Sequence, residues 1–346
     1  MSTTHGDPAL DALLLPFSDG TLARPAAGTL FMNARAGAAL QARDWPGLAC
    51  EQDFKPHADA LQAAGFEVAQ PDERQWPLVL LLPPRQREQA RALYARALAR
   101  VAPGGTVIAS VANDSGAKSA QADFARIAGP LSARSKHKCR VFWAQARPDA
   151  GDATLAAQWR SLDAPRRVAG GRFVSRPGVF AWDRVDPASA LLAAHLPGDL
   201  RGHAADLGAG YGYLSAELLQ RNPGIAALDV YEADARALAL ARENLAGFAT
   251  AVALDFRWHD VTAGLPGRYD VIVSNPPFHA PGGTERPDIG RAFIAAAAAA
   301  LKPGGRLWLV ANRHLPYEQA LGASFGSARL VAQGDGFKVV EAVRGR

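Results

Sequence analysis

The sequence predicts an α/β protein with two tandem domains, each containing a mostly parallel sheet. This prediction is based on an internal repeat, WPLVLLLPPRQREQARALYARALARVAPGGTVIASVAN (76–113) and YDVIVSNPPFHAPGGTERPDIGRAFIAAAAAALKPGGRLWLVAN (269–312). Each copy contains an apolar strand, Pro-Pro, a helical stretch, Pro-Gly-Gly, a second strand and Ala-Asn. Strands that alternate with helices are typical of parallel sheets, so we interpret the repeat as a duplicated α/β domain.

The domain boundary is expected between the two copies. A chain of 346 residues is long enough for two domains that each have a core. The intervening stretch RPDAGDATLAAQWRSLDAPRRVAGG (147–171) is richer in Asp, Pro and Gly, which favours a boundary. We therefore predict a first domain at 1–150, a linker at 151–171 and a second domain at 172–346.

Composition argues against several classes of protein. Hydrophobic residues make up 49% of the chain and charged residues 21%, as in a soluble globular protein. The two cysteines, Cys50 and Cys139, lie far apart without metal-ligand spacing, so neither a disulfide framework nor a cysteine-based zinc site is expected. The N-terminus lacks the features of a signal peptide, and no run approaches the ~18 apolar residues of a membrane span. We expect a cytoplasmic protein without a membrane partner.

Positive charge favours an anionic partner such as nucleic acid. The net charge is +5 and the pI is near 9.4. Two stretches concentrate arginine and lysine, PPRQREQARALYARALAR (83–100) and SARSKHKCR (132–140). Solvated arginine-rich surfaces without a partner account for each stretch equally well, so both interpretations stay open here.

The stretch VIVSNPPFHAPGG (271–283) has the character of a binding site at the end of a buried strand. Pro276 and Pro277 cannot extend the strand because they have no backbone N–H, and their fixed φ angles hold Asn275 and Phe278 in place. The alternative is a stiff strand exit with an incidental asparagine. In the first copy of the repeat, Leu82 replaces this asparagine.

A glycine-rich loop precedes this motif in the second half only. In HAADLGAGYGYLSAELL (203–219) a strand is expected to end at Asp206, and a helix to begin near Tyr213. Gly208 and Gly210 in the loop between them let a ligand approach the backbone closely, and the helix N-terminus offers free N–H groups. A tight strand-to-helix turn without a ligand is the alternative.

Two acidic residues follow at expected strand ends. Glu232 lies 26 residues after Asp206, where an acid can bind both hydroxyls of a ribose. Asp260 comes after the next strand and can accept a hydrogen bond from an adenine amino group. For Asp260 the alternative is a helix N-cap or a surface carboxylate.

Together these motifs resemble those of class I methyltransferases that use S-adenosylmethionine. The closer resemblance is to ribosomal RNA guanine-N2 methyltransferases of the small-subunit methyltransferase C type and their large-subunit relatives. It covers the second half through VSRPGVFAWDRVDPASALLAAHL, SNPPFHAPGG and VANRHLPYEQALGASFGSARLVAQGDGFKVVEA. The first half resembles the family's degenerate duplicate domain more loosely, through PPRQREQA, PGGTVIASVANDSGAKSA and KHKCRVFWA.

The resemblance implies two Rossmann-like domains, with a seven-stranded sheet and a reversed last strand in the second. It implies S-adenosyl-L-methionine as cofactor and ribosomal RNA, more specifically small-subunit RNA, as substrate. The cofactor-binding residues it implies, from the methionine side to the adenine, are Asp206, Gly208, Gly210, Glu232, Asp260 and Asn275, with Phe180 and Asp186 closing over the cofactor. The family usually has Gly-Leu-Asp where this chain has Arg-Val-Asp186.

The implied catalytic residues are Asn275, Pro276, Pro277 and Phe278. An exocyclic amine is a poor nucleophile because its lone pair is delocalised into the ring. If the Asn275 side-chain oxygen and the Pro276 carbonyl accept its hydrogens, the lone pair can face the methyl group. Phe278 then stacks on the flipped base. We expect no metal site, since the sequence contains no HExxH pair and no other recognisable ligand set.

Other functions remain open at this point. The same motif serves adenine-N6 and protein glutamine-N5 transfer, and a non-catalytic RNA-binding assembly factor or a nicotinamide dehydrogenase are further alternatives. We expect the first domain, which lacks the glycine loop and the asparagine, to bind no cofactor and to support substrate binding and stability. We also expect a monomer, because the two halves can form an intramolecular pseudo-dimer.

Overall fold

The computed structural model describes residues 6–147, 149–277 and 287–345. It contains two compact units, Met1–Ala164 and Pro165–Arg346. The segment 151–171 is not a separate linker: helix α6 (Ala153–Trp159) is part of the first unit and strand β7 (Arg166–Val168) part of the second. Helix α6 is held by the first unit because Trp159 is only 4% exposed and belongs to its core.

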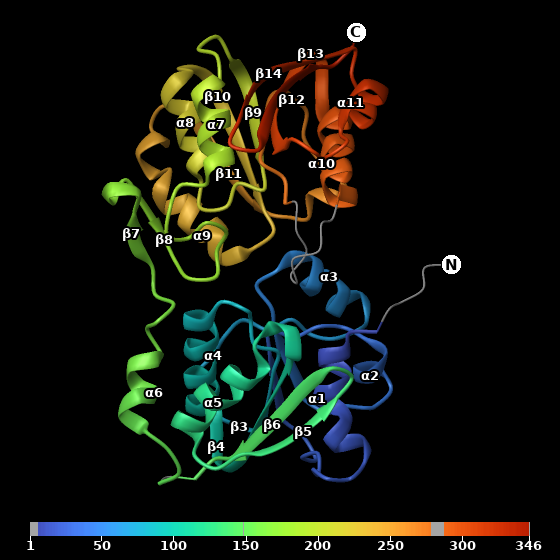
Figure 1. The fold of residues 1–346 in the computed structure, drawn as a ribbon, viewed down its shortest axis with the longest axis vertical. Helices are drawn as coiled ribbons and strands as arrows, with labels where there is room; N and C mark the ends of the chain where they lie inside the picture. The colour runs from blue at the N-terminus through green and yellow to red at the C-terminus, as the bar shows by residue number, and fades with distance from the viewer. Residues whose placement is uncertain (1–5, 148, 278–286, 346) are drawn as a thin grey trace. The chain divides into compact units, whose positions relative to one another are not determined.

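The first unit, coloured from blue to green in Figure 1, contains a sheet covered by helices. Its six strands have the order β2-β1-β3-β4-β6-β5. Its first four strands are parallel, whereas β6 is antiparallel to β4 and β5 is antiparallel to β6. The strands are β1 (Thr29–Met32), β2 (Leu48–Glu51), β3 (Trp76–Leu81), β4 (Val101–Ala112), β5 (Ser132–Lys136) and β6 (Cys139–Gln145).

Helices supply the two apolar clusters of this unit. Tyr94 and Phe124 belong to one cluster, and Leu13, Leu40 and Leu61 to the other. The first cluster is covered by α4 (Arg87–Arg100), α5 (Ala117–Ala128) and α6, and the second by α1 (Pro8–Ser18), α2 (Ala38–Gln41) and α3 (Lys55–Ala63), with a short η1 (Asn113–Ser115) after β4.

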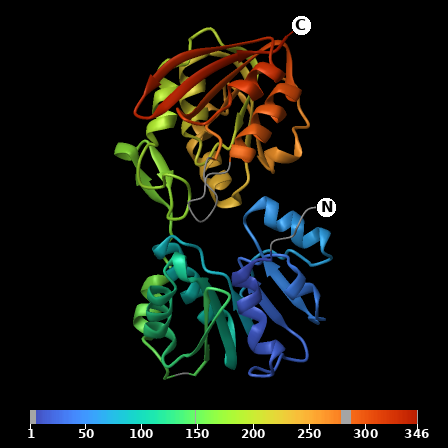
Figure 2. The same cartoon turned by 45° about the vertical axis from the view of Figure 1, so that its right-hand side comes forward.

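The second unit, coloured from green to red in Figure 2, contains a sheet. Its seven strands have the order β11-β10-β9-β12-β13-β15-β14. Its first five strands are parallel and β15 is antiparallel to β13, which confirms the expected reversed last strand. The strands are β9 (Arg201–Leu207), β10 (Gly224–Glu232), β11 (Ala253–Trp258), β12 (Tyr269–Ser274), β13 (Leu301–Asn312), β14 (Ser327–Gly334) and β15 (Phe337–Val343). A two-stranded sheet of β7 and β8 (Phe173–Ser175) precedes them.

The helices of the second unit also pack into two apolar clusters. One cluster contains Leu192, Leu214 and Leu238, and the other contains Phe293 and Leu321. The helices are α7 (Pro187–His195), α8 (Tyr213–Arg221) and α9 (Ala235–Asn244) for the first cluster and α10 (Pro287–Ala300) and α11 (Glu318–Ser324) for the second, with short turns η2 (Ala169–Gly171), η3 (Ala246–Phe248) and η4 (Val261–Ala263). Among the described residues, no helix combines the length and apolar character needed to cross a membrane.

The two sheets share strand order and register. Removing the edge strand β11 from the second order leaves the order of the first. Leu78 pairs with Thr106 between β3 and β4 as Val271 pairs with Arg306 between β12 and β13, with the same shift in register before each pair. The sequence repeat therefore corresponds to a repeated topology, and positions at the ends of the strands can be compared one by one.

The arginine-rich helix α4 is neutralised within the first unit. Arg87 and Arg91 each donate two hydrogen bonds to Asp123, and Arg96 pairs with Asp163. Burial alone would raise the pKa of Asp123, but the two guanidinium groups beside it lower that pKa to about 2. Arg100 pairs with Glu51 as well. Ion pairs within the first unit therefore account for four arginines of this stretch.

The second basic stretch forms the exposed β5–β6 hairpin. Lys136 ends β5, and His137 and Lys138 form the turn with positive φ angles of 52° and 57°. All three side chains are exposed, and within the described part of the chain neither lysine is paired with a carboxylate. The charges of Lys136 and Lys138 thus have no carboxylate partner among the residues that the structure describes, whereas Arg134 of the same hairpin pairs with Asp19.

Candidate active site

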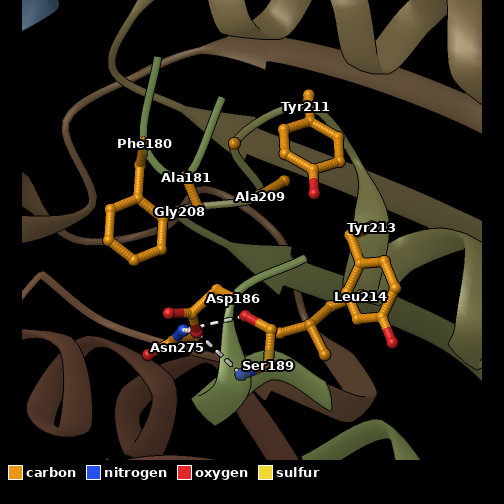
Figure 3. Close-up of a pocket in the computed structure, with 11 residues that line it drawn as sticks. Phe180, Ala181, Asp186, Ser189, Gly208, Ala209, Tyr211, Tyr213, Leu214 and Asn275 are labelled. Atoms are coloured by element: carbon orange, nitrogen blue, oxygen red, sulfur yellow. Dashed lines mark hydrogen bonds between the residues drawn. The ribbon is translucent and has the colours of Figure 1, made fainter. Parts of the chain in front are cut away.

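A pocket lies at the carboxyl ends of β9 and β12, the edge where parallel α/β sheets bind ligands. Eleven residues line it: Phe180, Ala181, Asp186, Ser189, Gly208, Ala209, Gly210, Tyr211, Tyr213, Leu214 and Asn275 (Figure 3). Five of them, from three separate parts of the sequence, were predicted as site residues. The fold therefore brings together Phe180, Asp186, Gly208, Gly210 and Asn275.

The glycine loop begins after β9 ends at Leu207. Gly208 and Gly210 have φ angles of 74° and 57°, in the left-handed region that favours glycine. A Cβ atom built on Gly210 would have no heavy atom within 4 Å, so the backbone is open to an approaching ligand there. The N–H groups of Gly208 and Ala209 both donate to the carbonyl of Tyr231, which fixes the loop against β10.

Glu232 ends β10, as predicted, and its side chain forms a hydrogen bond with the glycine loop. Its Oε2 accepts a hydrogen bond from the Gly210 N–H at 2.7 Å, and its Oε1 accepts one from the Asp234 N–H at 2.8 Å. Burial raises the pKa of the Glu232 carboxyl. The side chain touches the loop that lines the pocket, although it is not itself one of the lining residues.

Asp206 lies in the interior. Its side chain is fully buried, and Oδ2 accepts a hydrogen bond from Ser215 Oγ at 2.6 Å. Oδ1 has no hydrogen-bond partner within the described part of the chain. Burial raises the pKa of Asp206 to about 7, and the nearby charge of Glu232 acts in the same direction. Asp206 is one layer removed from the pocket, where the sequence predicted direct contact with a ligand.

Asp260 caps a short helical turn. Its Oδ1 accepts hydrogen bonds from the N–H and Oγ1 of Thr262, at 2.9 and 2.7 Å. It follows β11, which ends two residues earlier at Trp258, and it is not among the residues that line the pocket. The capping role that the sequence left as an alternative is the one the structure shows.

Phe180 and Asp186 come from the segment before α7. Phe180 lines the pocket with 65% of its surface exposed, an unusual position for a large apolar ring. Asp186 is the N-cap of α7, and its Oδ2 accepts a hydrogen bond from the Ser189 N–H at 2.8 Å. Pro187 occupies the first helical position, where an N–H would have no partner within the helix, so the absence of an N–H in proline costs nothing there.

Asn275 follows β12, whose last residue Ser274 donates from Oγ to the Leu207 carbonyl at 2.8 Å. This bond ties the ends of β12 and β9 together. The Asn275 Nδ2 donates to Asp186 Oδ2 at 2.9 Å and to Ser189 Oγ at 2.8 Å (Figure 3). Its Oδ1 is buried and has no hydrogen-bond partner among the described residues.

The remaining motif residues are placed only in part. Pro276 is buried and Pro277 is exposed. Phe278, the predicted stacking residue, and His279 lie outside the described residues. Among the residues that are described, no group of three His, Cys, Asp or Glu side chains could hold a metal ion, and both cysteines are free and buried.

Sequence reasoning missed Ser189 and the two tyrosines that line the pocket. Tyr211 donates from its hydroxyl to the Arg184 carbonyl at 3.2 Å, and burial raises its pKa to about 12. Tyr213 is the first residue of α8, directly after the glycine loop. This position directly after the loop could have indicated Tyr213 as a pocket residue from the sequence alone. Ser189 carried a weaker signal, its spacing of three residues from the N-cap Asp186.

Comparison with known proteins agrees with this geometry. The methyltransferase small domain family model matches residues 170–341. Ribosomal RNA small subunit methyltransferase C of Pseudomonas paraeruginosa is 34% identical over 269 residues, which cover 78% of this chain and 80% of that protein. Its counterpart in Shewanella halifaxensis is 30% identical and covers 84% of both chains.

A solved structure is similar over nearly the whole chain. It is the 16S rRNA N2 G1207 methyltransferase (RsmC) of T. thermophilus in complex with AdoMet and guanosine, 25% identical, with a TM-score of 0.80. The match covers 99% of this chain and 93% of that one.

The sheet with its reversed strand, the glycine loop and Asn-Pro-Pro define a methyltransferase that uses S-adenosyl-L-methionine. The P. paraeruginosa and S. halifaxensis relatives are matched over 80% and 84% of their length, at 34% and 30% identity. The chain belongs to the ribosomal RNA small subunit methyltransferase C family.

Proposed function

We propose that the protein transfers a methyl group from S-adenosyl-L-methionine to the exocyclic N2 of a guanine in small-subunit ribosomal RNA. The names of its relatives and the guanosine in the related T. thermophilus complex support this substrate. The observation that carries the chemistry is the buried Oδ1 of Asn275, which is without a partner among the described residues and belongs to a residue that lines the pocket.

Asn275 activates the amine by accepting one of its hydrogens. A buried acceptor without a partner is costly, and an incoming amino group removes that cost. The carbonyl of Pro276 accepts the second hydrogen, and neither proline offers an N–H that would compete with the amine. Both hydrogens are then held away from the methyl donor, so the nitrogen lone pair is free to attack, and the proton leaves after the nitrogen becomes cationic.

The cofactor-binding residues fit S-adenosyl-L-methionine, which supplies the reactive methyl group when bound. The glycine loop at Gly208 and Gly210, whose backbone is open at Gly210, accommodates its methionine side, and the lone pairs left on Glu232 accept from the ribose hydroxyls. Phe180 covers the pocket with its exposed ring. We propose that Asp206 supports the loop through Ser215, and that Asp260 reaches the adenine from its capping position.

The first domain serves substrate binding and stability, and it binds no cofactor. Its β5–β6 hairpin supports a role in RNA binding. Lys138 holds a positive φ that is unfavourable for a side chain with a Cβ, whereas the matching β14–β15 turn has Gly336 at that position. Lys136 and Lys138 offer unpaired charge to phosphates. We further propose that the protein is a cytoplasmic monomer.

The acceptor is identified by incubating the protein and radiolabelled S-adenosylmethionine with separated small subunits, large subunits, release factor and DNA. Labelled RNA is then digested to nucleosides. We expect N2-methylguanosine from small-subunit RNA. Label as N6-methyladenosine or in release factor would replace the substrate while keeping the site, and a cofactor-binding protein that labels none of the four would refute the proposal in favour of an assembly factor.

A further inference from the structure

We infer that Asp186 and Ser189 are positioning residues that hold the Asn275 amide in one orientation, with its oxygen presented to the substrate amine. This inference rests on the proposed function, because it concerns how the same site prepares its acceptor. Nothing in the sequence pattern connects these residues, since Asp186 and Asn275 are 89 positions apart. Together we call Asp186 and Ser189 the amide clamp.

The chemistry of the clamp determines which end of the amide faces it. An ionised carboxylate only accepts hydrogen bonds, so the end of Asn275 that meets Asp186 has to be the NH₂ group. The reverse orientation would place Oδ1 against Oδ2 of Asp186, two acceptors in contact. Asp186 therefore settles the assignment of amide oxygen and nitrogen, which distance alone leaves ambiguous.

Ser189 completes the clamp by taking the second amide hydrogen. The Nδ2 group has two hydrogens, and its contacts with Asp186 Oδ2 at 2.9 Å and Ser189 Oγ at 2.8 Å use both. The oxygen is thus the part of the amide left for substrate. An amide held this way need not reorganise when the amine arrives, and such preorganisation lowers the barrier of the chemical step.

The clamp is rigid because it is part of a helix start. Asp186 caps α7 through the Ser189 N–H at 2.8 Å, so the same Oδ2 that binds Asn275 also fixes the first turn. Ser189 is only 8% exposed, and α7 packs through Leu192 into a core cluster. Asn275 is consequently fixed from two sides, by β12 at its backbone and by α7 at its side chain.

Ser189→Ala removes one of the two acceptors and leaves the cap. We expect the turnover number to fall about 10- to 30-fold, as for loss of a modest preorganising contact, with KM for S-adenosylmethionine within twofold. Ser189→Thr, which keeps the hydroxyl, restores most of the rate. Asp152→Ala is the matched control: Asp152 caps α6 in the first domain through the Leu155 N–H at 2.8 Å, and its loss lowers stability without changing turnover.

A second readout does not depend on activity. In protein labelled with ¹⁵N-asparagine, the side-chain hydrogens of Asn275 should exchange with solvent at least tenfold faster in Ser189→Ala than in wild type, and at the wild-type rate in Ser189→Thr. Unchanged exchange and unchanged turnover in Ser189→Ala would overturn the clamp. The proposed function can fail without the clamp. In that case the wild type methylates no guanine, but hydrogen exchange at Asn275 is still faster in Ser189→Ala.

Discussion

The carboxyl edges of the two sheets share strand order and register but carry different side chains. Strand register makes Met32 of β1 equivalent to Leu207 of β9, so that Asn33 stands where the second domain has Gly208. Asn33 has a positive φ of 54°, close to the 74° of Gly208, but it carries a side chain. That side chain donates to the Leu82 carbonyl at 2.6 Å, across the ends of β1 and β3.

The position of Glu232 also carries a different residue in the first domain. Pairing of β2 with β1 places Gln52 where the second domain has Glu232. Both side chains accept from the N–H two residues later, at 2.8 Å in each domain. The other oxygen of Glu232 accepts from the glycine loop, whereas the Gln52 amide donates to the Ala34 carbonyl at 2.6 Å. In both domains this side chain forms a hydrogen bond with the loop after the neighbouring strand. Glu232 accepts there with a charged carboxylate, whereas Gln52 donates there with a neutral amide.

The two edges therefore differ in chemistry at three equivalent positions. In the second domain they are Gly208, Glu232 and Asn275, which provide a backbone without a side chain, a carboxylate and an amide oxygen that has no partner among the described residues. In the first they are Asn33, Gln52 and Leu82, whose polar groups satisfy one another or the backbone. The first domain keeps the sheet, and the side chains of Asn33 and Gln52 form hydrogen bonds across the same edge.

The largest expected effect comes from exchanging the third position. Asn275→Leu removes the acceptor of the amine, and we expect kcat to fall by about 10³-fold, as when a preorganised transition-state contact is lost. KM for S-adenosylmethionine should stay within a few-fold. The reciprocal Leu82→Asn is the control and should leave kcat unchanged. Substantial methylation by Asn275→Leu, measured with radiolabelled cofactor, would show that this position does not separate the two domains.

Blocking the open backbone at Gly210 tests the glycine loop, which begins at the first of these positions. Gly210→Val places a branched side chain in the free space beside the pocket, and we expect cofactor affinity to fall at least ~100-fold. Gly104→Val is the matched control, because Gly104 also has a positive φ, 77°, with nothing within 4 Å of its Cβ position. Calorimetry with S-adenosylmethionine distinguishes the two variants, since both lose some stability through backbone strain. Equal affinities in both variants would argue against the glycine loop as the cofactor site.

The buried carboxyl of Asp206 predicts a pH dependence of stability. Its pKa of about 7 in the folded protein lies above that of an unfolded aspartate, so the folded state binds the extra proton. Stability should therefore fall as pH rises from about 4 to 7, by roughly 2 kcal/mol over the upper two units of that range. Asp206→Asn should lose this part of the dependence.

Thermal unfolding of Asp206→Asn and wild type at several pH values measures this dependence. The first domain has Phe31 at the equivalent position, so this titration belongs to the second domain alone. Curves that stay parallel between pH 4 and pH 8 would show that Asp206 does not titrate there.

The smallest expected effect concerns the β5–β6 hairpin of the first domain. The double variant Lys136→Ala, Lys138→Ala should weaken RNA binding about tenfold and reduce the salt dependence of binding by about 1.5 in its logarithmic slope. Arg87→Ala is the matched variant, because Arg87 is already paired with Asp123 and its loss should act on stability. RNA binding measured over a range of salt concentrations separates the two. A larger loss in Arg87→Ala would move the RNA surface to α4.

Much of the architecture could be predicted from the sequence because it depends on local patterns. The repeat predicted a duplicated α/β domain with a mostly parallel sheet, and the positions of Glu232 and Tyr213 at element ends follow from the alternation of apolar runs and glycines. The motif at Asn275 was recognisable because two prolines directly after an apolar strand end it abruptly and fix the backbone on either side.

The sequence was least informative at positions where tertiary contacts decide the structure. Helix α6 belongs to the first domain because Trp159 is buried there, with Arg91 over its ring, and no local pattern announces that packing. The arginines of α4 meet Asp123 more than 30 positions away, so exposed and paired arginines looked alike in the sequence. Asp186 lines the pocket, as expected, but its hydrogen bonds with Asn275 and with the start of α7 join residues that no local pattern connects.

The functional difference between the two domains is tested by the stoichiometry of S-adenosylmethionine binding to the full chain, measured by equilibrium dialysis with labelled cofactor. We expect one site per chain, lost in Gly210→Val and retained when Asn33 and Gln52 are replaced by alanine. Two sites per chain, or one site that survives Gly210→Val and disappears with the Asn33 and Gln52 substitutions, would show that the first domain binds cofactor after all.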